Sequence, residues 1–338
     1  FNQVYDQLGV LLTDDDLMGE SRYEALMPEV YARLDRAGLV SENDGAEVVF
    51  PPGFTNRDNE PLPMIIRSSA GAFMYATSDL ACVLDRVERL GADLLLYVVG
   101  APQAQHFQMG FAVAEMAGWL APPAEAVHIP FGNVLGEDRK MLRSRTGGAV
   151  KLVELLDEAV ERAAAAVAEK NPDLDPAARA EVARMIGIGA VKYADLSTDR
   201  IKDYVFDWDR MLAFDGNTAP YLQYAHARIC SIFRRAGVDR SEVRDDRIVL
   251  GEVHERELAK RLLAYPSVLA DTVATYSPHK LCTYLFDLAQ DFTGFYEHCP
   301  VMKAVEPVRT SRLALCDVTA RTLAHGLDLL GIAAPDAM

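Results

Sequence analysis

The chain has 338 residues, 50% of them apolar and 25% charged, so its length predicts two domains and its composition excludes wholesale disorder. Fifty acidic residues against 34 Lys and Arg leave a formal net charge of −16, which argues against a protein that coats nucleic acid through a general basic surface. A shaped RNA partner remains compatible with this charge if the basic residues are clustered. No run approaches the roughly 18 apolar residues that a membrane span needs, so no membrane partner is expected.

The sequence begins with Phe1 and shows no charged leader or apolar signal core, so we expect a fragment whose natural N-terminus is missing. The cysteines are scattered, with no Cys-x-x-Cys pair and no Cys and His cluster recognised at zinc spacing, so no protein-bound metal is expected. Such cysteines are mostly small buried apolar side chains, and they indicate a reducing, cytoplasmic compartment. The five are Cys82, Cys230, Cys282, Cys299 and Cys316.

The first half of the chain alternates between helical and strand patterns. The solid apolar run at 94–100 predicts a strand buried on both faces. Strands and helices that alternate through short connections are typical of a parallel sheet, so we predict part of a doubly wound α/β domain. The expected elements are a helix at 21–38, two strands within 64–77, a helix at 78–90, a strand at 94–100, a helix at 103–119 and a strand at 127–135.

After residue 148 the strand patterns stop. Apolar residues recur at helical spacing through the rest of the chain, which predicts an all-α bundle that begins between 195 and 215. The expected helices cover 150–170, 176–193, 220–237, 280–298 and 308–330.

Three features fall at the carboxyl ends of predicted strands, where open α/β sheets bind ligands. Gln103 and His106 follow the strand 94–100, and Tyr75 and Asp79 follow a strand at 73–76. The third feature is the loop 136–145, in which four of the seven residues 139–145 are basic. A basic loop rich in Gly, Ser and Thr favours polyphosphate binding, but a solvated surface is the plain alternative. Likewise, Asp79 could be only a helix cap and His106 only a structural histidine.

The predicted helix 220–237 carries Tyr221, Tyr224 and Arg228, and the segment 220–240 holds four arginines and one acid. Aromatic rings interleaved with arginines suit the bases of single-stranded RNA. The alternative is an amphipathic helix with tyrosines in the core and a basic solvent face.

At these residues the chain resembles arginyl-tRNA synthetase, a class I aminoacyl-tRNA synthetase, over essentially its whole length. The resemblance rests on many ordered segments rather than on one motif. They include DGAEVVFPPGF (44–54), FMYATSDLA (73–81), LLYVVGAPQAQHF (95–107), FGNVLGEDRKMLRSRTGG (131–148), the long segment 186–228 and the tail GLDLLGIAAPDAM (326–338).

The resemblance implies part of a Rossmann-like class I synthetase catalytic domain at 1–200, followed by a helical-bundle anticodon-binding domain at 201–338. It implies an arginine–tRNA ligase that activates L-arginine with ATP and Mg²⁺ and transfers it to the arginine tRNA. Such a protein is expected to be cytoplasmic and monomeric, with ATP–Mg²⁺ as a substrate complex and no resident metal.

The same resemblance implies roles for individual residues. A carboxylate with flanking acceptors suits a planar guanidinium. The implied arginine pocket consists of Tyr75, Asp79 and Gln103, and the implied ATP contacts are His106, Val134 and Gly136. The implied catalytic cations of the phosphate loop are Lys140, Arg143 and Arg145. The implied anticodon contacts are Tyr221, Tyr224, Arg228, Tyr296 and Met338.

The chain departs from the family pattern in lacking the His-x-Gly-His signature that helps to hold ATP. We therefore expect the chain by itself to be inactive or nearly so. A truncated paralogue that binds tRNA or arginine without catalysis is the main alternative, and a paralogue that aminoacylates another acceptor is a further one.

Overall fold

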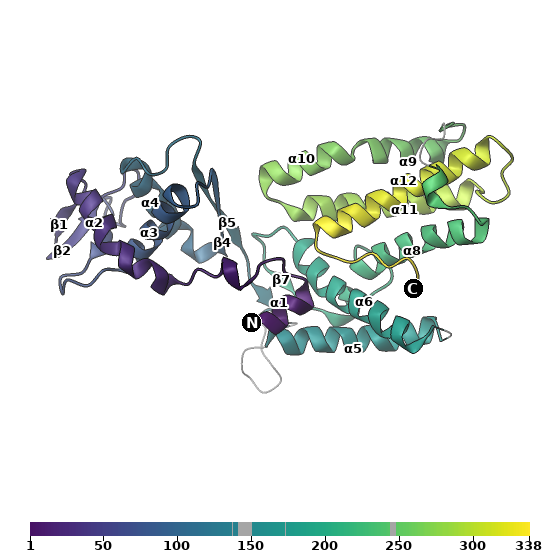
Figure 1. The fold of residues 1–338 in the computed structure, drawn as a ribbon, viewed down its shortest axis with the longest axis horizontal. Helices are drawn as coiled ribbons and strands as arrows, with labels where there is room; N and C mark the ends of the chain where they lie inside the picture. The colour runs from purple at the N-terminus through teal and green to yellow at the C-terminus, as the bar shows by residue number, and fades with distance from the viewer. Residues whose placement is uncertain (137, 141–150, 173, 244–247) are drawn as a thin grey trace. The chain divides into compact units, whose positions relative to one another are not determined.

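The computed structural model describes residues 1–136, 138–140, 151–172, 174–243 and 248–338 (Figure 1). The chain forms two compact units: residues Leu11–Gly132 make up one, and residues Phe1–Val10 together with Asn133–Met338 make up the other. Within the described residues, no helix combines the length and the apolar character needed to cross a membrane.

The unit 11–132 contains two sheets and the helices packed on them. Strands β1, β2 and β3 form an antiparallel sheet in that order, whereas β4 and β5 pair in parallel. The strands are β1 (Ser41–Asn43), β2 (Ala46–Val49), β3 (Met64–Arg67), β4 (Leu94–Gly100) and β5 (Glu125–Phe131). The helices are η1 (Asp14–Asp16), η2 (Glu20–Leu26), α2 (Met27–Arg36), α3 (Tyr75–Glu88), η3 (Ala101–Gln103) and α4 (Ala104–Met116).

The parallel pair of β4 and β5 with α4 between them confirms the predicted strand–helix–strand unit. The expected burial of β4 on both faces is wrong. Leu95 and Tyr97 belong to the core, whereas Leu94, Leu96 and Val98 are 45%, 43% and 63% exposed. An unbroken apolar run has no polar alternation to mark its solvent side, so the sequence could not distinguish one buried face from two.

The segment 64–77 also differs from prediction. Only β3 is a strand, and it belongs to the antiparallel sheet rather than to the parallel one. Phe73 makes a single bridge to Arg67, and α3 begins at Tyr75 instead of residue 78. The hydroxyl of Thr77 donates to the carbonyl of Ile66 over 2.6 Å, which fixes the first turn of α3 against β3.

The second unit is a helical assembly with one short parallel pair, β6 (Val134–Leu135) and β7 (Tyr204–Val205). Asp175 and Thr218 cap α6 and α8 by accepting backbone N–H groups, and a proline follows each cap within two residues. The helices α1, α7, α9 and α10 were not predicted from the sequence. The helices are α1 (Asn2–Leu8), α5 (Leu152–Lys170), α6 (Pro176–Leu196), α7 (Trp208–Met211), α8 (Ala219–Ala236), η4 (Arg240–Val243), α9 (Val253–Leu263), α10 (Tyr265–Thr275), α11 (Pro278–His298) and α12 (Val308–Leu329).

The main core of this unit lies among α8, α9, α11 and α12, as the apolar stripes of 280–298 and 308–330 predicted, and a smaller cluster lies between α5 and α6. The carboxyl-terminal tail after α12 returns to α8 (Figure 1), where Gln223 donates to the carbonyl of Ala333 over 2.8 Å. Lys192 on α6 donates to the carbonyls of both Leu8 and Gly331, so one ammonium group fastens the end of α1 and the start of the tail.

Candidate functional site

The predicted arginine-pocket residues lie on α3 and at the junction of η3 with α4. Because α3 begins at Tyr75, Tyr75 and Asp79 are one helical turn apart on the same helix. The N-cap of α3 is Met74, so Asp79 is not a helix cap. Gln103 is exposed at the end of η3, the 3₁₀ turn that leads from β4 into α4.

The structure brings His106 into direct contact with Asp79. The imidazole Nε2 lies 2.6 Å from Asp79 Oδ2, and the ring of His106 packs against that of Tyr75 with centroids 4.6 Å apart. The resemblance implied an arginine pocket with Tyr75 and Asp79 and an ATP site with His106, and the structure places these three side chains in contact. The cluster offers a partly exposed carboxylate beside an aromatic ring, an arrangement that can bind a planar cation.

The base of the predicted phosphate loop is a closed turn. Val134 lies in β6, paired with Tyr204, and the backbone N–H of Gly136 donates to the carbonyl of Lys140 over 2.8 Å. Arg139 has a left-handed backbone with φ of 57°, and Lys140 is exposed. The other two predicted bases, Arg143 and Arg145, lie outside the described residues.

The predicted anticodon residues of α8 share one face of that helix. Arg228 lies over the ring of Tyr296 on α11, with its Cζ 4.5 Å from the ring centroid. Tyr224 is 46% exposed, whereas Tyr221 is half-buried and packs against Phe286. The alternative interpretation, a core tyrosine on an amphipathic helix, therefore fits Tyr221 but not Tyr224.

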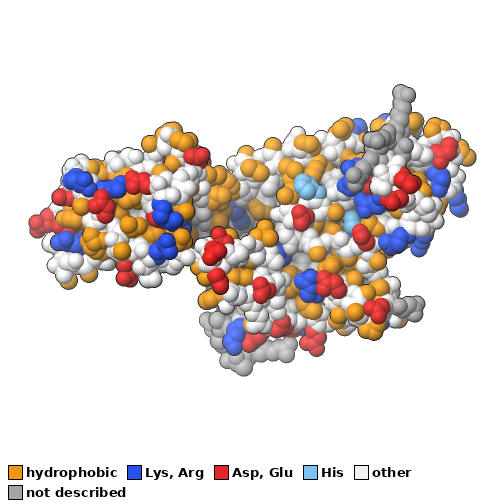
Figure 2. Space-filling view, viewed as in Figure 1, with side chains coloured by type: hydrophobic (Ala, Val, Ile, Leu, Met, Phe, Trp, Pro, Cys, Tyr) orange, Lys and Arg blue, Asp and Glu red, His pale blue; other side chains and the backbone are white. Residues whose placement is uncertain are grey.

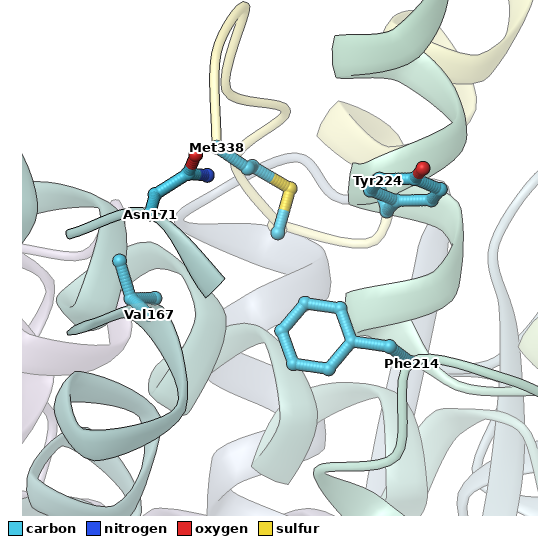
Figure 3. A pocket seen from close by; sticks show the side chains of 5 residues that line it. All are labelled: Val167, Asn171, Phe214, Tyr224 and Met338. Carbon is cyan, nitrogen blue, oxygen red and sulfur yellow. The ribbon is translucent and has the colours of Figure 1, made fainter. Parts of the chain in front are cut away.

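Tyr224 and the terminal Met338 meet in a pocket of about 490 Å³ (Figure 3). The side chain of Met338 points between Tyr224 and α5, and the ring of Phe214 closes another side. Val167 and Asn171 complete the lining from the C-terminal end of α5, so one amide group stands among apolar and aromatic side chains. Such a pocket can hold a flat, partly polar ring.

Besides Arg228, two of the four arginines at 220–240 bind the tail or α12. Arg240 pairs with Asp317 over 2.9 Å, and Arg234 donates to the backbone carbonyl of Asp336 over 2.9 Å. On the visible face of both units, acidic and basic side chains are intermixed (Figure 2). The concentration of arginines in this segment therefore reflects in part the attachment of the tail and of α12.

A cluster near the end of the same tail was not predicted from the sequence. His226 and Cys230 are four residues apart on α8, and Asp336 reaches them from a position 106 residues after Cys230. The i, i+4 spacing of a histidine and a cysteine was the available signal, but the third residue is not apparent before the tail is placed.

Two families of known proteins match this chain, one over each of its halves. A family model described as the catalytic domain of class I tRNA synthetases (R) matches residues 1–208, and the DALR anticodon binding domain matches residues 222–338. An α/β catalytic domain followed by this helical domain defines a class I aminoacyl-tRNA synthetase.

The relatives agree on the amino acid. The arginine–tRNA ligase of Thermobifida fusca is 55% identical over 100% of this chain, and that of Escherichia coli O157:H7 is 48% identical over 98%. The crystal structure of arginyl-tRNA synthetase from Plasmodium falciparum superposes with a TM-score of 0.87 at 28% identity, covering 100% of this chain and 56% of that one. The Thermus thermophilus arginyl-tRNA synthetase gives 0.87 at 29% identity, covering 100% and 62%.

The chain belongs to the arginine family of class I tRNA synthetases. It spans 58% of the length of the two curated relatives. The predicted fold class, an α/β catalytic domain followed by a helical anticodon-binding domain, is confirmed.

Proposed function

We propose that this chain carries out, as part of an arginine–tRNA ligase, the ATP-dependent activation of L-arginine and its transfer to the arginine tRNA. The observation that carries the proposal is the likeness to arginine–tRNA ligases along the whole chain, through both the catalytic and the anticodon-binding models. We assign residues 1–200 to the catalytic domain and 201–338 to the anticodon-binding domain, and we expect a cytoplasmic monomer.

In the arginine pocket, the guanidinium of the substrate would pair with Asp79. The cavity beside Asp79 and His106 measures about 10 Å³, room for about one water, so the substrate would lie on the exposed side of the carboxylate. There Tyr75 would offer its ring and Gln103 its amide oxygen. A guanidinium that pairs with both carboxylate oxygens would share Oδ2 with His106 or displace the imidazole, because His106 contacts that oxygen.

For the ATP site, class I synthetases use ATP with Mg²⁺ as a substrate complex. We propose that Val134, Gly136 and His106 contact the nucleotide, with Lys140, Arg143 and Arg145 as the catalytic cations beside the phosphates. The closed turn from Gly136 to Lys140 supports this assignment because it presents an exposed ammonium group at the start of the loop. Positive charge at the phosphates would stabilise the charge that develops in adenylate formation.

For tRNA, we propose that the pocket between Tyr224 and Met338 receives one unstacked base of the anticodon loop. Its lining supports this proposal, because two aromatic rings offer stacking surfaces while Asn171 offers a donor and an acceptor for a base edge. Arg228 and Tyr296, held together by their cation–π contact, would provide a neighbouring stacking and phosphate contact, with Tyr221 bracing the helix beneath.

The activity is tested by ATP–pyrophosphate exchange with L-arginine and arginine tRNA, on this chain and on the gene-extended protein. Asp79→Ala should raise the arginine KM by at least about 100-fold, as expected for the loss of a paired carboxylate worth about 3–5 kcal/mol. The matched control is Glu115→Ala, an exposed carboxylate on α4. No arginine-dependent exchange by the extended protein would refute the ligase assignment, and an unchanged KM would remove Asp79 from the pocket.

The RNA contact is tested with the anticodon stem-loop of arginine tRNA. Tyr224→Ala should weaken binding by about 1–3 kcal/mol if a base stacks on the ring. Tyr5→Ala, which removes an exposed tyrosine of α1 in the same unit, should leave binding unchanged. Equal losses in both variants would contradict the assignment of the pocket.

A further inference from the structure

We propose that His226, Cys230 and Asp336 form a binding site for a divalent transition-metal ion of the zinc type. His226 and Cys230 are 3% and 5% exposed and lie one turn apart on α8, while Asp336 is exposed on the tail. One ligand atom from each of the three lies within 4.8 Å of the other two. The proposal is independent of the ligase activity.

Two of the three distances between the ligand atoms match those around a tetrahedral ion, and the third, between His226 and Asp336, is within 4.8 Å. Typical zinc–nitrogen bonds of about 2.0 Å and zinc–sulfur bonds of about 2.3 Å place the two atoms about 3.5 Å apart at a tetrahedral angle, and the oxygen–sulfur edge is also about 3.5 Å. Here Nε2 of His226 lies 3.7 Å from Sγ of Cys230, and Oδ1 of Asp336 lies 3.4 Å from the same sulfur. An ion would therefore require little movement of these two pairs, and solvent beside the exposed Asp336 can supply a fourth ligand.

Sγ of Cys230 lies 3.7 Å from Nε2 and 4.0 Å from Nδ1 of His226, and the hydrogen bond made by Nδ1 leaves Nε2 as the ligand atom. Nδ1 lies 3.1 Å from the backbone carbonyl oxygen of Pro335. A carbonyl only accepts, so Nδ1 carries the proton and Nε2 presents its lone pair beside Cys230. Metal-binding histidines commonly hold their second N–H in this way.

The remaining neighbour of the sulfur is also compatible with a bound ion. Nη1 of Arg240 lies 3.6 Å from Sγ of Cys230, and the ion pair with Asp317 holds that guanidinium in place. A guanidinium at this distance can donate to a metal-bound thiolate. On binding, the metal–sulfur bond would replace the S–H bond and the proton would leave to solvent, with no change of oxidation state.

The donor set selects the kind of ion. Imidazole and thiolate favour zinc, cobalt and related ions, whereas magnesium and calcium prefer oxygen ligands alone. A metal here would join α8 to the tail two residues away from Tyr224 on the helix and two residues before Met338. It would therefore hold together two of the segments that line the pocket of Figure 3, α8 and the tail.

The test uses the full chain stripped with a chelator and then titrated with Co²⁺ and Zn²⁺. We expect one equivalent of Co²⁺ to produce a thiolate-to-cobalt charge-transfer band and the intense visible bands of a tetrahedral site, and one equivalent of Zn²⁺ to displace it. Cys230→Ser should abolish the charge-transfer band. Asp336→Asn should weaken binding at least about tenfold, since even outer-shell partners are worth that much.

Matched controls are Cys82→Ser, a buried cysteine of the other unit, and Asp328→Asn, an exposed carboxylate at the end of α12. Circular dichroism reports the fold of each variant, and the exposed position of Asp336 keeps its variant informative even if Cys230→Ser fails to fold. Absence of stoichiometric binding, absence of the charge-transfer band in the unaltered chain, or equal affinity in Asp336→Asn would each overturn the proposal. In those cases the three residues act only as a hydrogen-bonded anchor for the tail.

Discussion

The carboxylate of Glu255 offers a sharp test of how the helical domain is held together. It is 1% exposed and sits in the first turn of α9, where Oε2 accepts the backbone N–H groups of Gly251 and Glu252 over 2.7 and 2.8 Å. Oε1 accepts Nε of Arg312 over 2.7 Å, and that guanidinium is itself buried. Glu255→Ala removes both the cap, worth about 1 kcal/mol, and the partner of a buried charge, worth about 3–5 kcal/mol.

We therefore expect Glu255→Ala to lower the free energy of unfolding by about 4–6 kcal/mol. At about 2–4 °C per kcal/mol, the Tm of the helical transition should fall by about 10–20 °C. Thermal unfolding followed by far-UV circular dichroism measures the shift. The control Glu257→Ala removes an exposed carboxylate of the same helix and should leave the Tm unchanged.

The double variant Glu255→Ala/Arg312→Met separates the two contributions. An uncharged, flexible side chain leaves no buried cation, so the double variant should regain at least half of the loss. The reasoning is refuted if Glu255→Ala shifts the Tm no more than Glu257→Ala does, or if the double variant is less stable than the single one.

Three other predictions concern the same unit. A Cβ at Gly187 would lie 2.7 Å from the backbone of Ala159 on α5, so Gly187→Ala should lower the free energy of unfolding by about 1–3 kcal/mol or more, as measured by urea titration. The control Gly294→Ala should leave that free energy nearly unchanged, because the nearest atom to its Cβ is 3.5 Å away. Burial acts to raise the pKa of Glu255, but hydrogen bonds from the backbone and from the arginine hold that pKa below its usual 4.5. Its stabilisation is therefore complete above about pH 4.5 and is lost as the pH falls through the lower folded value, a pH dependence that Glu255→Gln should lack in acid unfolding. Lys192→Met should speed hydrogen exchange about tenfold in α1 and in the tail without comparable change in α11; unchanged exchange would mean that the ammonium does not fasten them.

The helices of this chain were the most predictable part of the fold. The apolar stripes at 280–298 and 308–330 gave the ends of α11 and α12 to within two residues, because burial of one face dictates the 3.6-residue period. The helix α10 was not predicted because none of its residues is buried, which leaves no strong stripe to recognise. The short strands β1 and β2 were not predicted for a related reason, since three or four residues carry too little pattern.

In the candidate sites, residues close in sequence could be grouped before the fold was known, whereas residues from distant segments could not. Tyr75 and Asp79 are of the first kind, although the predicted strand at 73–76 was wrong. The contact of His106 with Asp79 depends on how α3 packs on α4, and the sequence placed the two in different subsites. Asp336 could not be linked to α8 at all, because only the return path of the tail brings it there.

The exposed side of β4 has a consequence for how this chain behaves in concentrated solution. Leu94, Leu96 and Val98 form a row of apolar side chains on a parallel strand, a kind of strand that proteins usually cover on both faces. The net charge of −16 keeps molecules of this chain apart at low ionic strength, but salt shortens the range of that repulsion to about 10 Å at 0.1 M. The colloidal stability of the chain should therefore decline as salt rises, and light scattering should detect reversible clusters that a lysine in place of Leu96 disperses.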